Sequence, residues 1–364
     1  MTARLLDAAR APAPRPDGAA RPGECAAGPG DAAPARAPSL LTQAAPLVSI
    51  QGLKVAFDDG RRLVPVLHGI DLQIDRGETV GIVGESGCGK SVTWLAVLGL
   101  LGARAKVEGR VLLEGRPIHG LSGDALAPIR GKRIAMIFQD PASSLNPVQR
   151  IGRQLIESIS LHRGLGAQAA RAQAVRLLDR VHIPAAANRL DAYPHELSGG
   201  MNQRVMIAMA LAGEPDMLVA DEPTTALDAT IQAQILDLLR EIRRDSGMAL
   251  ALISHDLGVI AEICDRVTVM YAGRMVEQAP ANPLFERPRH PYTRGLLAAM
   301  PDHIGPRRPL VAIAGSVPEP GRLPRGCSFA PRCTEVGPDC SLVPPRAVSV
   351  GPDHQVACLR ARDA

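Results

Sequence analysis

The pattern of apolar positions divides the chain into alternating strand-like and helix-like parts. From Leu47, short β-type runs (LVSIQGLKVAF, GIDLQI, ETVGIVG) are separated by Gly and Asp, and the apolar segment from Ser91 to Leu101 is typical of a helix. Residues 148–190 show helical periodicity without β-branched runs. Strand and helix then alternate again through MLVAD, IQAQILDLLREIRRDSG, ALALISH and RVTVMYAG. This order predicts an α/β fold with an inserted helical lobe.

The two ends of the chain differ from this central part. Residues 1–46 are mainly Ala, Pro, Gly and Arg and contain few large apolar side chains, so burial cannot offset the entropy of ordering them. After Glu286 the chain becomes rich in Pro and Arg, and its cysteines lie in loop-like sequence. We therefore expect a disordered tail over 1–46, a main domain over 47–285 and an extension over 286–364.

Composition excludes several classes of protein. Aromatic residues make up 2% of the chain and the net charge is +4 over 364 residues, which disfavours a nucleic-acid-binding protein. The longest apolar stretch, from Trp94 to Ala103, is about half of what a bilayer requires, and the N-terminus lacks the apolar core of a signal peptide. The seven cysteines are too few for a disulfide scaffold. We expect a globular protein in a reduced, cytoplasmic setting that neither spans a membrane nor is secreted.

A phosphate-binding loop is predicted between Gly84 and Ser91. The segment GESGCGKS fits G-x-x-x-x-G-K-[ST], follows the strand TVGIV and precedes a helix. Backbone N–H groups of such a loop bind phosphate, the lysine reaches the β- and γ-phosphates and the serine hydroxyl ligates Mg²⁺. A chance Gly-rich turn of this form has a probability of roughly one per cent at average composition. The predicted nucleotide contacts here are Gly84, Glu85, Ser86, Gly87, Cys88, Gly89, Lys90, Ser91 and Val92.

A pair of carboxylates, Asp221 and Glu222, ends the strand MLVADE. One carboxylate in this position can hold the Mg²⁺ shell, and the other can position and polarise an attacking water. Acidic pairs at strand ends are often only solvated turns. The phosphate loop upstream favours the catalytic interpretation, with Mg²⁺ near Ser91 and Asp221.

The segment LSGGM, from Leu197 to Met201, precedes the helical sequence NQRVMIAMALA. A serine at a helix N-terminus caps the helix, and its hydroxyl together with the first amides can also hold a γ-phosphate. With the phosphate loop and the acidic pair, it resembles the signature motif of ATP-binding cassette (ABC) transporter ATPases over about residues 47–285. Met201 departs from the Gln of many relatives. The resemblance implies a P-loop NTPase (RecA-like) core, an antiparallel β portion and a helical lobe over about 141–204.

The same resemblance implies roles for further residues. Gln139, after RIAMIF, matches the glutamine that senses Mg²⁺ and water and links to the membrane subunit; His255 matches the switch histidine of the γ-phosphate. Phe57 is the candidate for stacking on adenine, with a half-buried strand residue as the alternative. Ala226-Leu227-Asp228 resembles the loop that crosses the dimer interface. The expected catalytic residues are Glu222, His255, Lys90 and Gln139. The expected Mg²⁺ ligands are Ser91, Gln139 and Asp221. The further nucleotide contacts expected are Ser198, Gly199, Gly200 and Asp228.

Two other segments narrow the resemblance. QDPASSLNP (139–147), and RHPYTR (289–294) with the cysteines after it, are similar to ATPase subunits of bacterial oligopeptide and dipeptide importers. This implies ATP and Mg²⁺ as cofactors, a second ATPase (identical or homologous), two transmembrane permease subunits and, indirectly, a solute-binding protein. The expected location is peripheral, on the cytoplasmic face of the inner membrane. The alternatives are the same role for nickel or another solute, or a soluble ABC ATPase acting on ribosomes or DNA.

Four cysteines lie close to the C-terminus, in a Pro- and Gly-rich stretch with little apolar sequence for a core of its own: Cys327, Cys333, Cys340 and Cys358. Because disulfides are disfavoured in the cytoplasm, we expect a bound metal or cluster to hold this stretch together. The spacing does not resemble the paired C-x₂-C of structural zinc sites. Relatives of the peptide-importer type carry a similar cysteine cluster, in some cases with a [4Fe-4S] centre, so an iron–sulfur cluster is expected first, with Zn²⁺ as the alternative. Four unliganded thiols are the remaining possibility.

Overall fold

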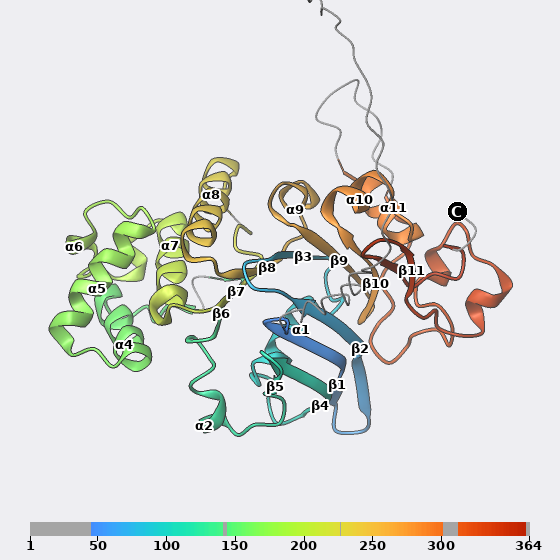
Figure 1. Cartoon of the computed structure of the whole chain (residues 1–364), viewed down its shortest axis with the longest axis horizontal. Coiled ribbons are helices and arrows are strands. Elements are labelled where there is room, and N and C mark those ends of the chain that lie inside the picture. The colour runs from blue at the N-terminus through green and yellow to red at the C-terminus, as the bar shows by residue number, and fades with distance from the viewer. Residues whose placement is uncertain (1–44, 141–143, 226, 301–311, 362–364) are drawn as a thin grey trace, which may run out of the picture. The chain divides into compact units, whose positions relative to one another are not determined.

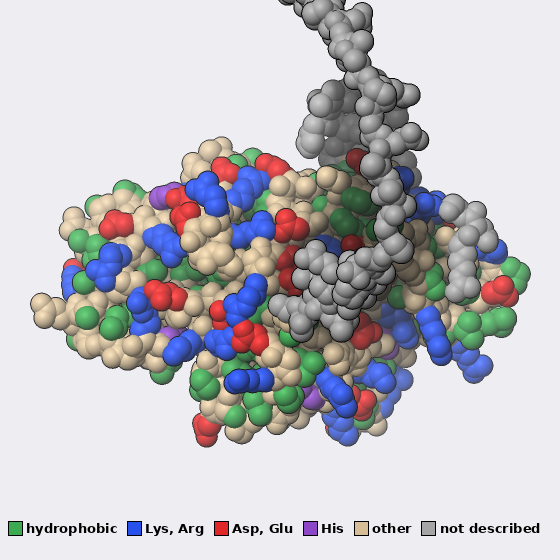
Figure 2. Space-filling model, in the orientation of Figure 1, with side chains coloured by type: hydrophobic (Ala, Val, Ile, Leu, Met, Phe, Trp, Pro, Cys, Tyr) green, Lys and Arg blue, Asp and Glu red, His purple; other side chains and the backbone are tan. Residues whose placement is uncertain are grey.

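The computed structural model describes residues 45–140, 144–225, 227–300 and 312–361 (Figure 1). The tail expected over residues 1–46 lies outside these ranges except for its last two residues. In the described ranges no helix is both long and apolar enough to cross a bilayer. Side chains of both charge signs are interspersed over the face shown in Figure 2.

An antiparallel sheet forms from the first strands of the chain, in the order β2-β1-β4-β5. The strands are β1 (Val48–Asp58), β2 (Leu63–Ile74), β4 (Ala105–Leu113) and β5 (Arg116–Pro117). The predicted run GIDLQI is only the end of β2, which begins six residues earlier because it pairs with β1 along its length.

The main sheet has the order β11-β12-β10-β9-β3-β8-β7-β6. The pairs β3–β9, β3–β8, β7–β8 and β6–β7 are parallel, and β10, β11 and β12 add to one side antiparallel. In chain order the strands are β3 (Thr79–Val83), β6 (Ile134–Ile137), β7 (Met217–Asp221), β8 (Ala249–Ile253), β9 (Arg266–Tyr271), β10 (Arg274–Pro280), β11 (Val348–Gly351) and β12 (His354–Val356).

The main sheet separates two apolar cores. In β7, Met217 and Val219 join the cluster that contains the antiparallel sheet and α1 (Lys90–Val97), whereas Leu218 and Ala220 join the cluster of helices on the other face. Successive side chains of a strand point to opposite faces, and a strand buried on both faces has a continuous apolar run. This explains why MLVAD and ALALI contain no polar alternation.

Except for residues 123–126, which pack against the core of the antiparallel sheet, the remaining helices cover the second face, and some of them form the lobe on the left of Figure 1. In the lobe, α4 packs against α5 and α7. Its elements are α4 (Ile151–Arg163), α5 (Ala167–Arg180), α6 (Ala186–Arg189), the 3₁₀ turn η1 (Pro194–Glu196), α7 (Gly199–Ala210) and the 3₁₀ turn η2 (Leu211–Gly213). Elsewhere lie α2 (Gly123–Leu126), α8 (Ala229–Ser246), α9 (Leu257–Ile263), α10 (Ala281–Glu286) and α11 (Pro291–Ala298). The start of the expected lobe, residues 141–143, lies outside the described residues.

One expectation about local structure is wrong, and another is incomplete. The helix predicted to Leu101 ends at Val97, because Gly99 adopts a left-handed backbone with φ 61° that ends the last turn. The loop-like stretch after Glu286 contains α11, two 3₁₀ turns, η3 (Ala330–Arg332) and η4 (Pro338–Ser341), and two strands. Of these strands β12 pairs with β10, so the extension is part of the main sheet.

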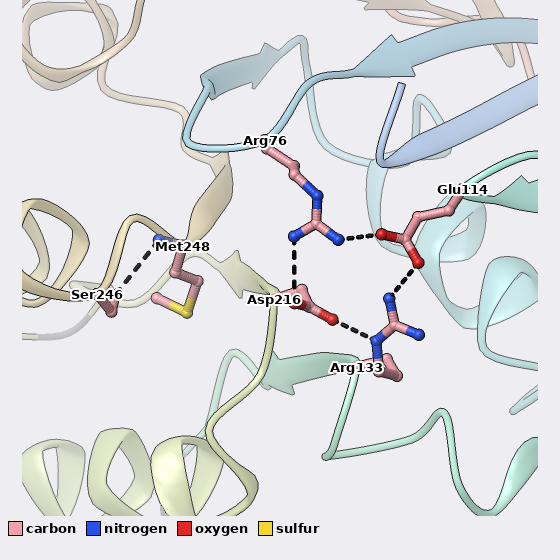
Figure 3. A network of polar contacts seen from close by, with 6 residues as sticks. All are labelled: Arg76, Glu114, Arg133, Asp216, Ser246 and Met248. Atoms are coloured by element: carbon pink, nitrogen blue, oxygen red, sulfur yellow. Dashed lines mark hydrogen bonds and ion pairs between the residues drawn. The ribbon is translucent and has the colours of Figure 1, made fainter. Parts of the chain in front are cut away.

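A network of four charged side chains connects the two sheets (Figure 3). Arg76 contacts Glu114 and Asp216, and Arg133 contacts the same two carboxylates. Arg76 precedes β3, Glu114 follows β4, and Arg133 and Asp216 precede β6 and β7. The network therefore lies at the amino ends of the parallel strands. Beside it in the figure, the Met248 N–H donates to Ser246 Oγ at 3.3 Å, before β8 begins.

Candidate active site

The predicted site residues follow the carboxyl ends of neighbouring parallel strands. Ile82 of β3 pairs with Ile253 of β8, which also pairs with Asp221 of β7, and the preceding residue of β7 pairs with Ile137 of β6. The loops after these four strands therefore meet at one edge of the sheet, the usual ligand-binding edge of such folds. They carry the phosphate loop, Glu222, His255 and Gln139.

The phosphate loop folds tightly around its lysine. Lys90 Nζ donates to the carbonyl oxygens of Gly84 at 2.8 Å and Glu85 at 3.2 Å, and the side chain is only 6% exposed. A Cβ at Gly84 would lie 2.2 Å from the Met270 carbonyl oxygen, so only glycine fits there. Gly89 has a φ of 105° at the N-terminus of α1. The Lys90 ammonium is thus held by two backbone carbonyl oxygens of its own loop.

The outer part of the loop is more accessible than its base. Ser86 and Gly87 are exposed, Glu85, Ser91 and Val92 are half-buried, and Cys88 is buried. Burial also raises the pKa of the Cys88 thiol, which keeps it neutral. The accessible tip and the buried lysine are the arrangement that a phosphate-binding loop requires.

Asp221 and Ser91 lie together at the base of the site. Asp221 is 4% exposed, and its burial raises the pKa of the carboxyl, while a hydrogen bond with the Ser91 hydroxyl and the charge of Lys90 oppose this rise. A hydroxyl and a carboxylate are hard oxygen ligands of the kind that Mg²⁺ prefers. The pair is therefore chemically suited to hold Mg²⁺ beside the phosphate loop.

Three side chains contact the same carboxylate oxygen of Glu222. Its Oε2 accepts from Gln139 Nε2 at 3.0 Å and from Thr225 Oγ1 at 2.9 Å, and it lies 3.4 Å from Nδ1 of His255. The backbone of Glu222 is left-handed, with φ 49°, a conformation that costs energy for a residue other than glycine. The structure thus brings together three of the residues expected to be catalytic, from three strand ends. Sequence reasoning missed Thr225, whose only signal is its place in the same turn.

The signature segment and the predicted interface loop meet at two helix N-termini. Ser198 Oγ accepts from the Met201 N–H at 3.3 Å, and Asp228 Oδ1 accepts from the Ile231 N–H at 2.9 Å. A Cβ at Gly200 would lie 2.7 Å from Ile231 Cγ2, so α7 and α8 touch there. Gly199 begins α7, while Ala226 lies outside the described residues. Within the described ranges, neither Ser198 nor Asp228 hydrogen-bonds to residues 84–91 of the same chain.

Phe57 lies near the end of β1, half-buried and packed against the core cluster of the antiparallel sheet. Its neighbours across the sheet are Val64 and Ala105. This packing is what a strand residue would have, and the adenine-stacking role stays a prediction.

The four C-terminal cysteines line a single cavity, although as many as 31 residues separate them. The Cys327 N–H donates to the Cys340 carbonyl oxygen at 2.7 Å, and burial raises the pKa of the Cys327, Cys333 and Cys358 thiols. In the part of the chain that the structure describes, no group of three or more His, Cys, Asp or Glu is arranged to hold a metal ion. The described cysteines are free thiols, so the expected iron–sulfur or zinc centre gains no support from this arrangement.

Comparisons with known proteins agree with this geometry. The family model described as "ABC transporter" matches residues 67–225, and that described as "Oligopeptide/dipeptide transporter, C-terminal region" matches residues 276–340. The oligopeptide transport ATP-binding protein OppD of Haemophilus influenzae is 48% identical over 299 residues, which cover 82% of this chain and 93% of that protein. The chain belongs to the ABC transporter family.

Other relatives of this ABC ATPase support the same conclusion. A Brucella melitensis protein, provisionally named as a peptide import ATP-binding protein, is 50% identical over 303 residues, 83% of this chain and 91% of its own. The dimeric ATP-binding cassette MJ0796, solved in a post-hydrolysis state with ADP and phosphate, aligns with a TM-score of 0.58 and 28% identity. It covers 64% of this chain and 98% of its own. The α/β fold expected for an ABC ATPase, with P-loop core and antiparallel portion, is confirmed.

Proposed function

We propose that the chain hydrolyses ATP to drive the import of dipeptides or oligopeptides through a membrane transporter. The observation that supports hydrolysis most directly is the Glu222 carboxylate, which is held by Gln139 and faces His255 at the sheet edge that carries the phosphate loop. Peptide as the solute is supported by the family of residues 276–340 and by the names of the relatives.

In the proposed mechanism, residues 84–92 bind the phosphates through backbone N–H groups and the Lys90 ammonium. The Ser91 hydroxyl, the Asp221 carboxylate and the Gln139 amide oxygen would hold Mg²⁺, which neutralises phosphate charge when bound. Gln139 bonds Glu222 through its amide nitrogen, so its amide oxygen is the atom that would take this role. Glu222 orients water for attack on the γ-phosphate, and Lys90 and His255 stabilise the charge that develops there.

We infer that a second cassette, identical or homologous, completes each nucleotide site. Ser198 and its neighbouring glycines lie at the N-terminus of α7 and are exposed or half-buried, and their contacts are with α7 and α8. A partner's phosphate loop can therefore approach this helix end. Asp228, also exposed, would lie at the interface between the cassettes, and Phe57 would stack on adenine.

Complementation tests the shared site. A Ser198→Arg chain mixed with a Lys90→Ala chain is expected to regain part of the ATPase activity that each lacks alone, because the mixed dimer has one intact composite site. Activity independent of protein concentration in a monomer would contradict the shared site.

A cavity beside Gln139 supports docking of the membrane permeases. It lies between the edge strand β6 and the helical lobe and is lined mostly by apolar side chains, among them Leu100, Leu145, Met206 and Phe138, which is 40% exposed. Because Phe138 directly precedes Gln139, movement of a docked helix can reach the Glu222 carboxylate. We propose that the transporter contains two permease subunits and that a permease docks at this cavity of the cassette. A periplasmic or extracellular solute-binding protein would act indirectly, through the permeases. The chain would then lie peripherally on the cytoplasmic face of the inner membrane.

Transport by the reconstituted complex tests the proposed solute. The chain, assembled in proteoliposomes with the permeases and binding protein of its transporter, is expected to take up a labelled tripeptide with ATP and to lose uptake in the Glu222→Gln variant. Uptake of nickel instead of peptide would contradict the proposed solute. Purification with ribosomes or DNA, without permeases, would contradict transport itself.

As a finer proposal, Cys327, Cys333, Cys340 and Cys358 would hold a thiolate-ligated centre, an [4Fe-4S] cluster first and Zn²⁺ as the alternative. The support is that four thiols line one cavity in the C-terminal extension. A cluster does not require its ligands to converge on one point, whereas a single tetrahedral ion does. Anaerobic purification is expected to yield roughly four irons per chain, lost in Cys333→Ser. Stoichiometric zinc would exclude the cluster, and four titrating thiols in the folded protein would exclude both.

A further inference from the structure

The phosphate loop is bound by a side chain from the C-terminal extension. Arg332, in η3, reaches the Glu85 carboxylate with both ends of its guanidinium, Nη1 to Oε2 at 2.6 Å and Nη2 to Oε1 at 2.9 Å. The Arg332 side chain is only 6% exposed. Its Nε donates to the Ala314 carbonyl oxygen at 2.8 Å, and the guanidinium lies 5.8 Å from the centre of the Tyr271 ring. Such a bidentate pair fixes both partners in one geometry.

A second contact holds the backbone of the same loop residue. The hydroxyl of Tyr292, in α11, accepts a hydrogen bond from the Glu85 N–H at 2.9 Å. Tyr292 is fully buried, and its ring packs against Tyr271 and Phe329 with centroid distances of 4.7 and 5.3 Å. Burial raises the pKa of the Tyr292 hydroxyl, which therefore stays neutral. Glu85 is thus held at its side chain and its backbone by residues far along the chain.

Glu85 is an unfavourable residue for a loop that binds a polyanion, because its carboxylate repels a triphosphate nearby. The Arg332 guanidinium cancels this charge and holds the carboxylate toward the extension. The Glu85 carbonyl oxygen also accepts from Lys90 Nζ, so the position of this residue affects the lysine directly. A shift of Glu85 would therefore alter both the charge and the geometry that meet the phosphates.

We propose that Arg332 and Tyr292 are positioning residues of the nucleotide site, through which the C-terminal extension sets the ATP affinity of its own cassette. This inference rests on ATP binding at residues 84–91. It gives the extension a role in nucleotide binding in addition to any centre held by the cysteines.

Nucleotide affinity of the full-length chain tests the proposal, measured with a fluorescent ATP analogue and Mg²⁺. Arg332→Ala is expected to weaken affinity by about tenfold, because the Glu85 charge is left unpaired near the phosphates. Adding Glu85→Gln to Arg332→Ala is expected to restore most of the affinity, since the repulsion is then removed. Arg332→Lys keeps the positive charge but lacks the two-pronged guanidinium, so its affinity should lie between those of the wild type and Arg332→Ala. Tyr292→Phe should weaken affinity a few-fold through the unpaired Glu85 N–H.

Arg294→Ala is the matched control, because it removes an Arg–Glu pair of the same extension, with Glu335, that does not touch the loop. Its affinity should equal that of the wild type. Unchanged affinity in a folded Arg332→Ala chain would overturn the proposal. A loss of affinity in Arg332→Ala that Glu85→Gln does not restore would also overturn it, since the extension would then act only as a structural support. A wild-type chain without nucleotide affinity would instead contradict the ATPase function, and the proposal with it.

Discussion

At the residue scale, Glu222 is the carboxylate to which the proposed mechanism assigns the positioning of water. Gln139 and Thr225 donate to one of its oxygens and leave the other without these bonds, so its orientation is set before water binds. The left-handed backbone at Glu222 turns the side chain out of the strand that ends at Asp221. Sequence predicts the residue type here but not this orientation, which comes from contacts between three different loops.

Glu222→Gln is expected to keep ATP affinity while turnover falls at least about 100-fold, the usual contribution of a positioned general base. Because the phosphate contacts remain, ATP should then trap a closed dimer, detectable by size-exclusion chromatography. Glu286→Gln, on α10, is a control that should keep wild-type turnover. Near-normal hydrolysis by Glu222→Gln would exclude this carboxylate as the group that positions water.

The buried Asp221 predicts a pH dependence of Mg²⁺ binding. Burial raises the pKa of its carboxyl above 3.8, so a proton competes with Mg²⁺ at pH values above the usual range for aspartate. Mg²⁺ affinity of the nucleotide complex should therefore fall as pH is lowered through this raised pKa and should be constant well above it. Titration calorimetry over pH 4 to 8 measures this. Asp221→Asn should bind Mg²⁺ weakly at every pH, and an equal pH slope in that variant would assign the effect to another group.

At the element scale, a strand or helix can be predicted from the sequence when it has an apolar pattern of its own. Strand β7 matches the predicted MLVAD run, and α8 matches the predicted helix to within two residues at its N-terminus, because each has an apolar pattern of its own. Strand β12 has no such pattern: it is three residues long and exists because Glu277 and Val356 pair across strands. Likewise, Arg332 meets Glu85 across 247 residues, a contact that no local pattern encodes.

A buried histidine at the N-terminus of α11 predicts that the C-terminal extension becomes less stable at low pH. Burial lowers the pKa of His290, at the N-terminus of this helix, to about 3, so the folded protein holds it neutral while its Nδ1 accepts from the Tyr292 N–H. The unfolded chain takes up a proton at its ordinary pKa of 6.5. The stability that His290 contributes is therefore full above pH 6.5 and decreases as pH falls toward 3.

His290→Asn tests this effect, because asparagine can cap the helix without titrating. Below pH 6.5, the free energy of unfolding should decrease less steeply in the variant than in the wild type, as measured by urea titration. The nearby pair of Glu277 and His354 is present in both proteins, so it does not distinguish them. Identical slopes would show that His290 does not carry the acid sensitivity.

At the scale of the whole described domain, the site and the charged network lie at opposite ends of the parallel strands. Glu114→Gln should lower the free energy of unfolding by about 1 kcal/mol, because it removes one carboxylate from a partly exposed four-residue network. The loss should shrink at high salt, where ion pairs are screened. Nucleotide affinity should not change. Glu262→Gln, a single exposed pair with Arg240, is the control expected to cost less.

The pairing of β12 with β10 has a consequence for where this chain can be cut. A protein shortened before Val348 would lose β11 and β12, and β10 would then present its unpaired backbone groups at the margin of the sheet. Open margins of this kind recruit strands from other molecules, so such a fragment is expected to self-associate. The strands β11 and β12 are therefore expected to limit self-association of the sheet that carries the phosphate loop.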